Sequence, residues 1–346
     1  MLMHTILPIL NRRTLLRTSG ALALAAGAAT VSTILPGLAG GTAAEASPAT
    51  PAVGVYPFMI GAFQTYSVSD GGGPAPNFPV YPVFTGPAAP KEEVEALPES
   101  HFLPRDLARG DINNLPIDTG KNRVPFDTGA AGLMGPLGGH LPSRLAAAGL
   151  DPSTIDTVVL SHGHFDHIGG ILSAEGKLNY PNATFVMAED EWAFWAADDV
   201  EAKLVAAGVP DGLRSVLLPA ARANLAAIKD KITLVKAGVD VVPGVSTVAT
   251  HGHTPGHVAF RVSSGDLELT NIVDVVHDYV TGMAHPEWTP TADQDPGQAA
   301  ATRAKLLDQS ATDRTLTMAY HFPFPGLGHV ARKHSAYEWV PAPWVW

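Results

Sequence analysis

Three histidines and one aspartate fall within Ser161-His162-Gly163-His164-Phe165-Asp166-His167-Ile168-Gly169-Gly170. The preceding residues, 155–160, are rich in β-branched side chains and predict a buried strand, so the cluster lies where that strand ends. In an extended chain, residues two apart point the same way, so His162 and His164 can reach one ion. A turn at Phe165 would direct Asp166 and His167 to a second ion. Imidazole and carboxylate at this spacing indicate a zinc-type site rather than a polar loop with incidental histidines.

The composition excludes several classes of function. A chain of 346 residues that is 46% hydrophobic can bury a large core, enough for one large α/β domain or two small ones. Its formal net charge of −11 repels phosphate backbones, so we expect no nucleic-acid partner. There is no cysteine, which excludes disulfides, thiolate metal ligands and a cysteine nucleophile.

Residues 1–46 have the pattern of an export signal. Arg12 and Arg13 precede an uncharged Ala/Gly/Leu-rich run over 19–41, which ends near the small-residue site Ala44-Glu45-Ala46. This segment resembles a bacterial Tat leader. The run is nearly long enough for a permanent anchor, but its composition and cleavage site favour removal. We therefore expect a periplasmic or secreted protein with no stable membrane anchor after cleavage, a linker at 47–57 and one domain at 58–346.

Strands and helices occur in two comparable halves, which predicts sheets covered by helices. Within this pattern we expect a single strand over 58–68, an irregular proline-rich and aromatic loop over 74–90 and a helix over 137–149. Short apolar strands then follow in close succession from residue 232 to 273. The pattern is that of an α/β protein.

Further candidate ligands follow other predicted strands. His253 lies in the turn His251-Gly252-His253-Thr254-Pro255-Gly256-His257, Asp274 ends an apolar strand over 267–273, and His321 ends a strand over 315–320. An α/β fold places its chemistry at strand ends. Taken singly, each residue has the competing interpretation of a cap or a surface group. In this order behind the first cluster, they indicate a metal site far more specifically.

The motifs His162-x-His164-x-Asp166-His167 and His253-Thr254-Pro255-Gly256-His257, with Asp274 and His321, resemble the metallo-β-lactamase superfamily. Among its branches the sequence is most similar to the methyl parathion hydrolase group, with N-acyl homoserine lactonases and glyoxalase II as more distant relatives. The resemblance implies a four-layer αβ/βα sandwich with a dinuclear metal site at the sheet edges. It implies one metal held by His162, His164 and His253, a second held by Asp166, His167 and His321, and Asp274 and a hydroxide bridging the two.

The sequence departs from the family pattern at one position. The family usually has glycine before the bridging aspartate, whereas Val273 precedes Asp274 here, so the backbone could pack differently and Asp278 is a weaker candidate for the bridge. The family assigns the ligand to His253. We therefore expect hydrogen-bonding or structural roles for His251 and His257.

The predicted chemistry is metal-assisted hydrolysis. Two divalent ions roughly 3.5–4 Å apart lower the pKa of a shared water, so the nucleophile is a hydroxide, with Asp166 and Asp274 as the catalytic carboxylates around it. Asp127, at the end of another predicted strand, is expected to orient a ligand imidazole. Zn²⁺ is the preferred metal, with Mn²⁺, Fe²⁺ and Co²⁺ as alternatives.

We expect a small apolar substrate: a lactone or an aryl ester, with aryl phosphotriesters also considered. Aromatic residues near the site could form its pocket, with ordinary core packing as the competing interpretation. These are Phe165, Trp192, Trp195, Phe322 and Phe324. The alternatives are an N-acyl homoserine lactonase, a mono-iron oxidoreductase of the same fold resembling sulfur dioxygenases, and a binding protein that has lost turnover. The resemblance also suggests a homodimer.

Overall fold

A computed structural model describes residues 53–73, 79–105 and 109–343. The predicted export leader and residues 47–52 of the predicted linker lie outside these residues. None of the helices in the described ranges is long and apolar enough to cross a membrane.

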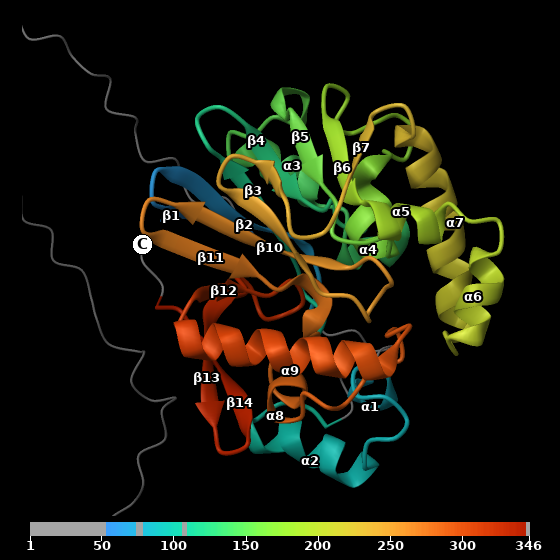
Figure 1. Cartoon of the computed structure of the whole chain (residues 1–346), viewed down its shortest axis with the longest axis vertical. Helices are drawn as coiled ribbons and strands as arrows, with labels where there is room; N and C mark the ends of the chain where they lie inside the picture. The colour runs from blue at the N-terminus through green and yellow to red at the C-terminus, as the bar shows by residue number, and fades with distance from the viewer. Residues whose placement is uncertain (1–52, 74–78, 106–108, 344–346) are drawn as a thin grey trace, which may run out of the picture. The chain divides into compact units, whose positions relative to one another are not determined.

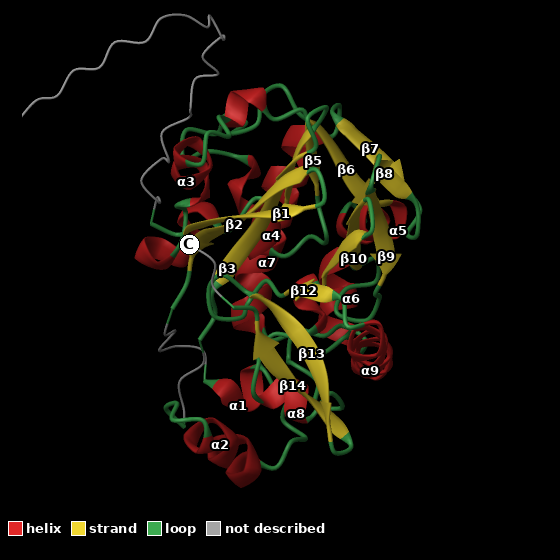
Figure 2. Ribbon diagram, turned by 90° about the vertical axis from the view of Figure 1, so that its left-hand side faces the viewer, coloured by secondary structure: helices red, strands yellow, loops and turns green. Residues whose placement is uncertain are grey.

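Two seven-stranded sheets form the centre of the fold (Figures 1 and 2). The first has the order β1-β2-β3-β4-β5-β6-β7 and the second β14-β13-β12-β11-β10-β9-β8. The strands are β1 (Val55–Ile60), β2 (Phe63–Gly71), β3 (Ile112–Asp118), β4 (Arg123–Phe126), β5 (Thr157–Val159), β6 (Thr184–Ala188), β7 (Ile232–Val235), β8 (Asp240–Val242), β9 (Val245–Ala249), β10 (Val258–Ser264), β11 (Leu267–Asn271), β12 (Leu316–Met318), β13 (Leu327–Lys333) and β14 (Ala336–Pro341).

The described helices are α1 (Val80–Val83), α2 (Lys91–Ser100), α3 (Leu141–Ala147), α4 (Phe165–Ile168), α5 (Glu189–Trp195), α6 (Val200–Ala206), α7 (Asp211–Ile228), α8 (Thr281–Ala284) and α9 (Pro296–Asp313). Helices cover the outer face of each sheet, whereas α1 and α2 pack together in an apolar cluster of their own. Figure 1 shows α5 and α7 beside the first sheet and α9 lying across the second. Side chains of α3 and α7 share one apolar core with the first sheet, and those of α9 share another with the second.

The period-2 alternation of the strands explains the layers. Val158 and Leu160 pack outward among helix side chains, whereas Val159 packs inward against the second sheet, where Phe260 belongs to the same core. Ala259, the neighbour of Phe260, faces the core under α9. Both sheets are therefore buried on two sides, which confirms the predicted four-layer sandwich.

The structure corrects four boundaries. The predicted strand over 58–68 is a hairpin, because Gly61 has a φ of +55° and turns β1 back onto β2. Since β1 begins at Val55, residues 55–57 belong to the sheet and not to the predicted linker. Of the helix predicted over 137–149, only α3 is helical, because Gly139 has a φ of +83° and its backbone is not helical just before α3 begins. The predicted irregular loop over 74–90 contains the short helix α1.

The sheet topology gathers the predicted ligands. Strands β4, β5 and β6 run parallel in the first sheet, and β11 and β12 run parallel in the second. The ends of parallel strands meet at one edge of a sheet. The segments that follow β4, β5, β11 and β12 carry Asp127, His162, Asp274 and His321.

Candidate metal centre

The segment after β5 separates its ligand candidates by a change in backbone conformation. His164 is extended, with φ −73° and ψ 153°, and α4 begins at the next residue. Asp166 and His167 therefore leave the chain from a helical turn, which directs them away from the extended pair. Gly170 then passes against the loop after β4, where a β-carbon would lie 2.0 Å from the carbonyl oxygen of Thr128. Only glycine allows this approach.

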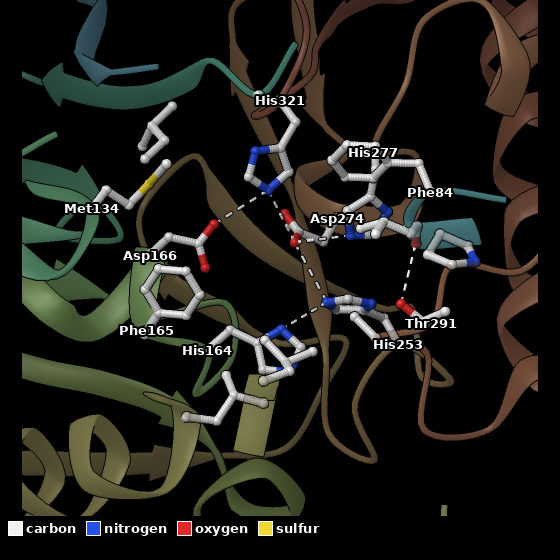
Figure 3. A pocket seen from close by; sticks show the side chains of 17 residues that line it. Phe84, Met134, His164, Phe165, Asp166, His253, Asp274, His277, Thr291 and His321 are labelled. Atoms are coloured by element: carbon white, nitrogen blue, oxygen red, sulfur yellow. Dashed lines mark hydrogen bonds and ion pairs between the residues drawn. The ribbon is translucent and has the colours of Figure 1, made fainter. Parts of the chain in front are cut away.

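The structure brings all seven predicted ligands together. One group consists of His162, His164, His253 and Asp274, and the other of Asp166, His167 and His321; within each group the candidate ligand atoms lie within 4.8 Å of one another. Asp274 lies between the groups, and Figure 3 shows His253 and His321 pointing at its carboxylate. Its Oδ2 is 3.4 Å from Nε2 of His253 and 3.3 Å from Nε2 of His321, and its Oδ1 is 3.2 Å from Nε2 of His167.

The donor set fits divalent metal ions. His162 Nε2, His167 Nε2 and Asp274 Oδ1 are buried and, within the part of the chain that the structure describes, have no hydrogen-bond partner. Leaving a buried polar atom unpaired costs about 1–3 kcal/mol. Here several such atoms converge on the same space. Imidazole nitrogens around a carboxylate are the ligands of zinc and its neighbours in the first transition row, so metal ions would satisfy them.

Charge is distributed unevenly over the cluster. Burial lowers the pKa of His162 and His164 far below the usual histidine value, and neighbouring histidines lower it further. Burial also opposes protonation of His253, but contacts with Asp274 and Asp293 raise its pKa to about 9. Burial raises the pKa of Asp274, yet His167 and His321 outweigh it and hold that pKa well below the usual value. The centre therefore contains an ionised carboxylate among neutral and protonated imidazoles.

Asp127 lies in contact with His167. Its Oδ2 is 2.9 Å from Nδ1 of His167, and its two oxygens accept hydrogen bonds from the backbone N–H and the hydroxyl of Ser161. These contacts leave Nε2 of His167 free to face Asp274. Asp127 has a φ of +61°, an uncommon conformation for a residue with a side chain, which its hydrogen bonds compensate.

Asp293 supports His253 in the same way, and sequence reasoning missed it. Its Oδ1 is 2.8 Å from Nδ1 of His253, and its Oδ2 accepts a hydrogen bond of 3.0 Å from the buried guanidinium of Arg303 on α9. Arg303 also donates to the carbonyl oxygen of Val275, next to Asp274. The sequence contains no local signal for this pair, because Asp293 lies in a loop and Arg303 is a charged residue on a long helix.

The neighbouring histidines and Asp278 lie outside the ligand groups of the described residues, and the ring of His257 packs 4.9 Å from that of His162. Among the described residues, neither His251 nor His257 belongs to a group that could hold a metal ion, and Nδ1 of His257 lies 2.8 Å from the hydroxyl of Thr250. Burial lowers the pKa of His257 to about 3. Asp278 accepts hydrogen bonds from Val280 and Thr281 at the start of α8 instead of facing the centre.

Val273 takes the backbone conformation for which glycine is suited. Its φ is +46°, which is strained for a β-branched residue, and its side chain is fully buried between the sheets. The 3₁₀ turn η4 (Val273–Val275) then presents the Asp274 carboxylate. The valine therefore has a left-handed backbone conformation at the position where the resemblance leads us to expect glycine.

A cavity opens onto the cluster (Figure 3). Of the five predicted pocket aromatics, only Phe165 is among its lining residues. Trp195 and Phe322 are buried in the core, and Trp192 packs against the same core as Trp195; Phe324 is partly buried and is likewise absent from the lining. None of these four residues is among the lining residues of this cavity; Trp192 and Trp195 extend from α5 toward the core, and Phe322 packs in the core after β12.

The apolar wall of the cavity comes mostly from other segments. Its members include Val83, Phe84, Met134, Leu213 and Leu217. Sequence reasoning also missed His277, which lines the cavity with Nε2 3.3 Å from Oδ2 of Asp274 and forms a further ligand-type group with Asp274 and His321. Its position three residues after a predicted ligand was the available signal.

The sequence and the fold both match known proteins. A family model described as the metallo-beta-lactamase superfamily matches residues 117–319, more than half of the chain. The structure of AidC, a dizinc quorum-quenching lactonase in complex with a product, is 28% identical, with a TM-score of 0.77 over 84% of this chain and 98% of AidC. AbOPH, a hydrolase in the beta lactamase superfamily, is also 28% identical, with a TM-score of 0.75 over 86% of this chain and 100% of AbOPH.

A more distant match shows the fold alone. It is an N-acyl homoserine lactone hydrolase with the product N-hexanoyl-L-homoserine bound at its catalytic metal center. It is 16% identical to this chain, with a TM-score of 0.51 over 78% of this chain and 100% of that one.

Proposed function

The chain belongs to the metallo-β-lactamase superfamily and is a metal-dependent hydrolase, and from that premise we propose that it is a dizinc enzyme that opens lactones or cleaves aryl esters. The observation that carries the proposal is the position of Asp274 between two groups of buried ligand-type side chains. We assign one ion to His162, His164 and His253, the other to Asp166, His167 and His321, and the bridge to Asp274. Zinc is the preferred ion, as in the dizinc neighbour AidC.

When bound, two divalent ions supply a water acidified toward neutral pH and polarise the oxygen of the scissile group. The side chains of the protein supply the positioning. Asp127 and Asp293 hold the imidazoles of His167 and His253 with Nε2 facing inward. The Asp166 carboxylate, with Oδ2 3.5 Å from Nε2 of His321, lies on the cavity side of the cluster, where it can orient a water for attack.

The cavity supports the choice of substrate. The polar cluster lies between apolar side chains, with Met134 and Phe165 on one side of it and Phe84 on the other, beside His277 (Figure 3). A site of this kind binds an apolar chain or ring while the scissile carbonyl faces the polar cluster. The similarity to AidC, a lactonase whose structure contains a bound product, supports lactones with an acyl chain as the substrate class. The resemblance to methyl parathion hydrolases adds aryl phosphotriesters as a second substrate class.

The test combines metal analysis and turnover on one sample. We expect close to two zinc-type ions per chain and hydrolysis that chelation abolishes and zinc restores. The assay set is an N-acyl homoserine lactone, a δ-lactone, an aryl ester and an aryl phosphotriester, and the order of kcat/KM values assigns the substrate class. A single iron per chain without hydrolysis would overturn the proposal in favour of the mono-iron oxidoreductase. Bound metal without turnover on any of the four would favour the binding protein.

We also propose export through the Tat pathway, on the basis of the segment with Arg12 and Arg13. Replacing both arginines by lysine should leave the precursor uncleaved inside the cell, whereas the unaltered chain is recovered outside the cytoplasm. Equal export of the two proteins would contradict this proposal.

A further inference from the structure

Glu191 is a fully buried carboxylate that the proposed chemistry does not use. It lies on α5, two residues after the helix begins, and its exposed fraction is 0%. A buried carboxylate is costly unless hydrogen bonds compensate for its lost hydration. The hydrogen bonds of Glu191 therefore indicate its role in the structure.

Each carboxylate oxygen of Glu191 accepts two hydrogen bonds. Oε1 accepts from the backbone N–H of Gly163 at 2.8 Å and from the indole N–H of Trp195 at 2.6 Å. Oε2 accepts from the hydroxyl of Thr254 at 2.6 Å and from the backbone N–H of Gly256 at 2.9 Å. Gly163 separates His162 from His164, and Thr254 follows His253. One carboxylate thus joins the two loops that carry His162, His164 and His253.

The glycines of both loops fit this arrangement. A β-carbon on Gly163 would lie 2.4 Å from the indole of Trp195, and one on Gly256 would lie 2.1 Å from the backbone nitrogen of Glu191. Each loop therefore approaches α5 as closely as a backbone can. The loops come from different sheets. The backbone N–H of Val258 donates to the carbonyl oxygen of Ser161 at 3.3 Å, and Glu191 joins the same two segments close to His164 and His253, whose Nδ1 and Nε2 are 3.0 Å apart.

We infer that Glu191 is a positioning residue, which holds the His162–His164 loop and the His253 loop at the spacing that one metal ion requires. This inference rests on the proposed metal centre. Because Gly163 and Trp195 offer only donors, a glutamine must turn its carbonyl oxygen toward them. Its NH₂ group then faces Thr254, whose hydroxyl can accept, and Gly256, whose N–H cannot. Glu191→Gln should therefore loosen the His253 loop specifically.

The experiment compares Glu191→Gln with Glu189→Gln, the same change at an exposed position of α5. Zinc affinity is measured by competition with a chromophoric chelator, and ligand geometry by the visible spectrum of the Co²⁺-substituted protein. We expect Glu191→Gln to bind zinc about 10–100-fold more weakly, with an altered Co²⁺ spectrum, as for other residues that orient ligands. In the metal-free variant, the backbone amide of Gly256 should exchange its hydrogen faster, while that of Gly163 stays protected. Glu189→Gln should match the wild type.

A folded Glu191→Gln protein with wild-type zinc affinity and Co²⁺ spectrum would overturn the inference, even if it melts at a lower temperature. If Glu191→Gln does not fold, Thr254→Val removes one donor at nearly constant volume and applies the same test, with a smaller expected loss of affinity. Failure of the wild type to bind zinc would overturn the proposed function, and this inference with it. Wild-type binding with unaffected variants would overturn the inference alone.

Discussion

Asp293 and Arg303 form a buried ion pair of 3.0 Å directly behind His253. One oxygen of the Asp293 carboxylate accepts a hydrogen bond from the Arg303 guanidinium, and the other faces Nδ1 of His253. Because a protonated Nδ1 leaves Nε2 as the nitrogen with a free lone pair, the pair selects the tautomer that can bind a metal ion.

Asp293→Asn should weaken zinc binding about 10–100-fold. Its carbonyl oxygen can serve Arg303 or His253 but not both, and an amide N–H facing Nδ1 would place the ring proton on Nε2. The matched control is Asp295→Asn, since Asp295 caps α9 by accepting from Gln298 and asparagine caps a helix equally well. Chelator competition measures both affinities. Equal affinity in the two variants would contradict the assigned role.

Zinc affinity should rise with pH up to about 9. Contacts with Asp274 and Asp293 overcome the effect of burial and raise the pKa of His253 to about 9, so below that pH the metal must displace a proton. Each released proton makes the affinity up to tenfold stronger per pH unit. Calorimetry in two buffers of different ionisation enthalpy counts the protons. A pH-independent affinity between pH 7 and 8.5 would contradict the raised pKa of His253.

The raised pKa of His253 also predicts how the stability of the metal-free protein depends on pH. The pKa of His253 in the folded state lies above the ordinary value of 6.5, so its contribution to stability is fully present below pH 6.5. That contribution is lost as pH rises through about 9. The free energy of unfolding of the metal-free protein should therefore fall over this window, and Asp293→Asn should reduce the fall. Urea denaturation at several pH values measures it, and a curve that rises instead would contradict the shift.

Phe84→Ala should reduce kcat/KM for substrates with long apolar groups by roughly an order of magnitude and leave short-chain substrates nearly unchanged. Phe84 lines the cavity, with its ring centre 5.9 Å from that of His277, so the change removes apolar contact area rather than a ligand. The control is Phe102→Ala, because Phe102 is 99% exposed. Comparable losses for a hexanoyl and an acetyl ester would mean that Phe84 does not contact the substrate chain.

Val273→Gly should lower the free energy of unfolding by about 1–3 kcal/mol, even though it relieves backbone strain. The lost burial of the valine and the added freedom of glycine outweigh about 1–2 kcal/mol of strain at a φ of +46°. Val262 is equally buried and lies within strand β10. Val262→Gly should therefore cost about 1–2 kcal/mol more, because no strain is relieved there. Urea unfolding of both metal-free variants tests this, and an equal loss would mean that Val273 stores no strain.

Strand-end clusters of histidine and aspartate indicated a ligand site, and the resemblance to the metallo-β-lactamase superfamily implied the seven ligand candidates and the four layers. Strands and helices in two comparable halves predict sheets covered by helices, and a strand end followed by His162-x-His164-x-Asp166-His167 predicts a ligand cluster. These patterns are short-range, so they are visible in one stretch of chain. Asp127 was found for the same reason, because it also follows a strand.

The tertiary structure decided which residues hold the ligand side chains and their loops in place, and which residues line the cavity. Asp293 and Arg303 come from a loop and a helix that carry no ligand, Glu191 is an acid in the first turn of a helix where sequence favours solvent exposure, and Phe84 lies far from the motifs along the chain. Their roles depend on packing between segments from both sheets. Spacing along the chain does not encode such contacts, because burial of a charged or aromatic side chain depends on what folds against it.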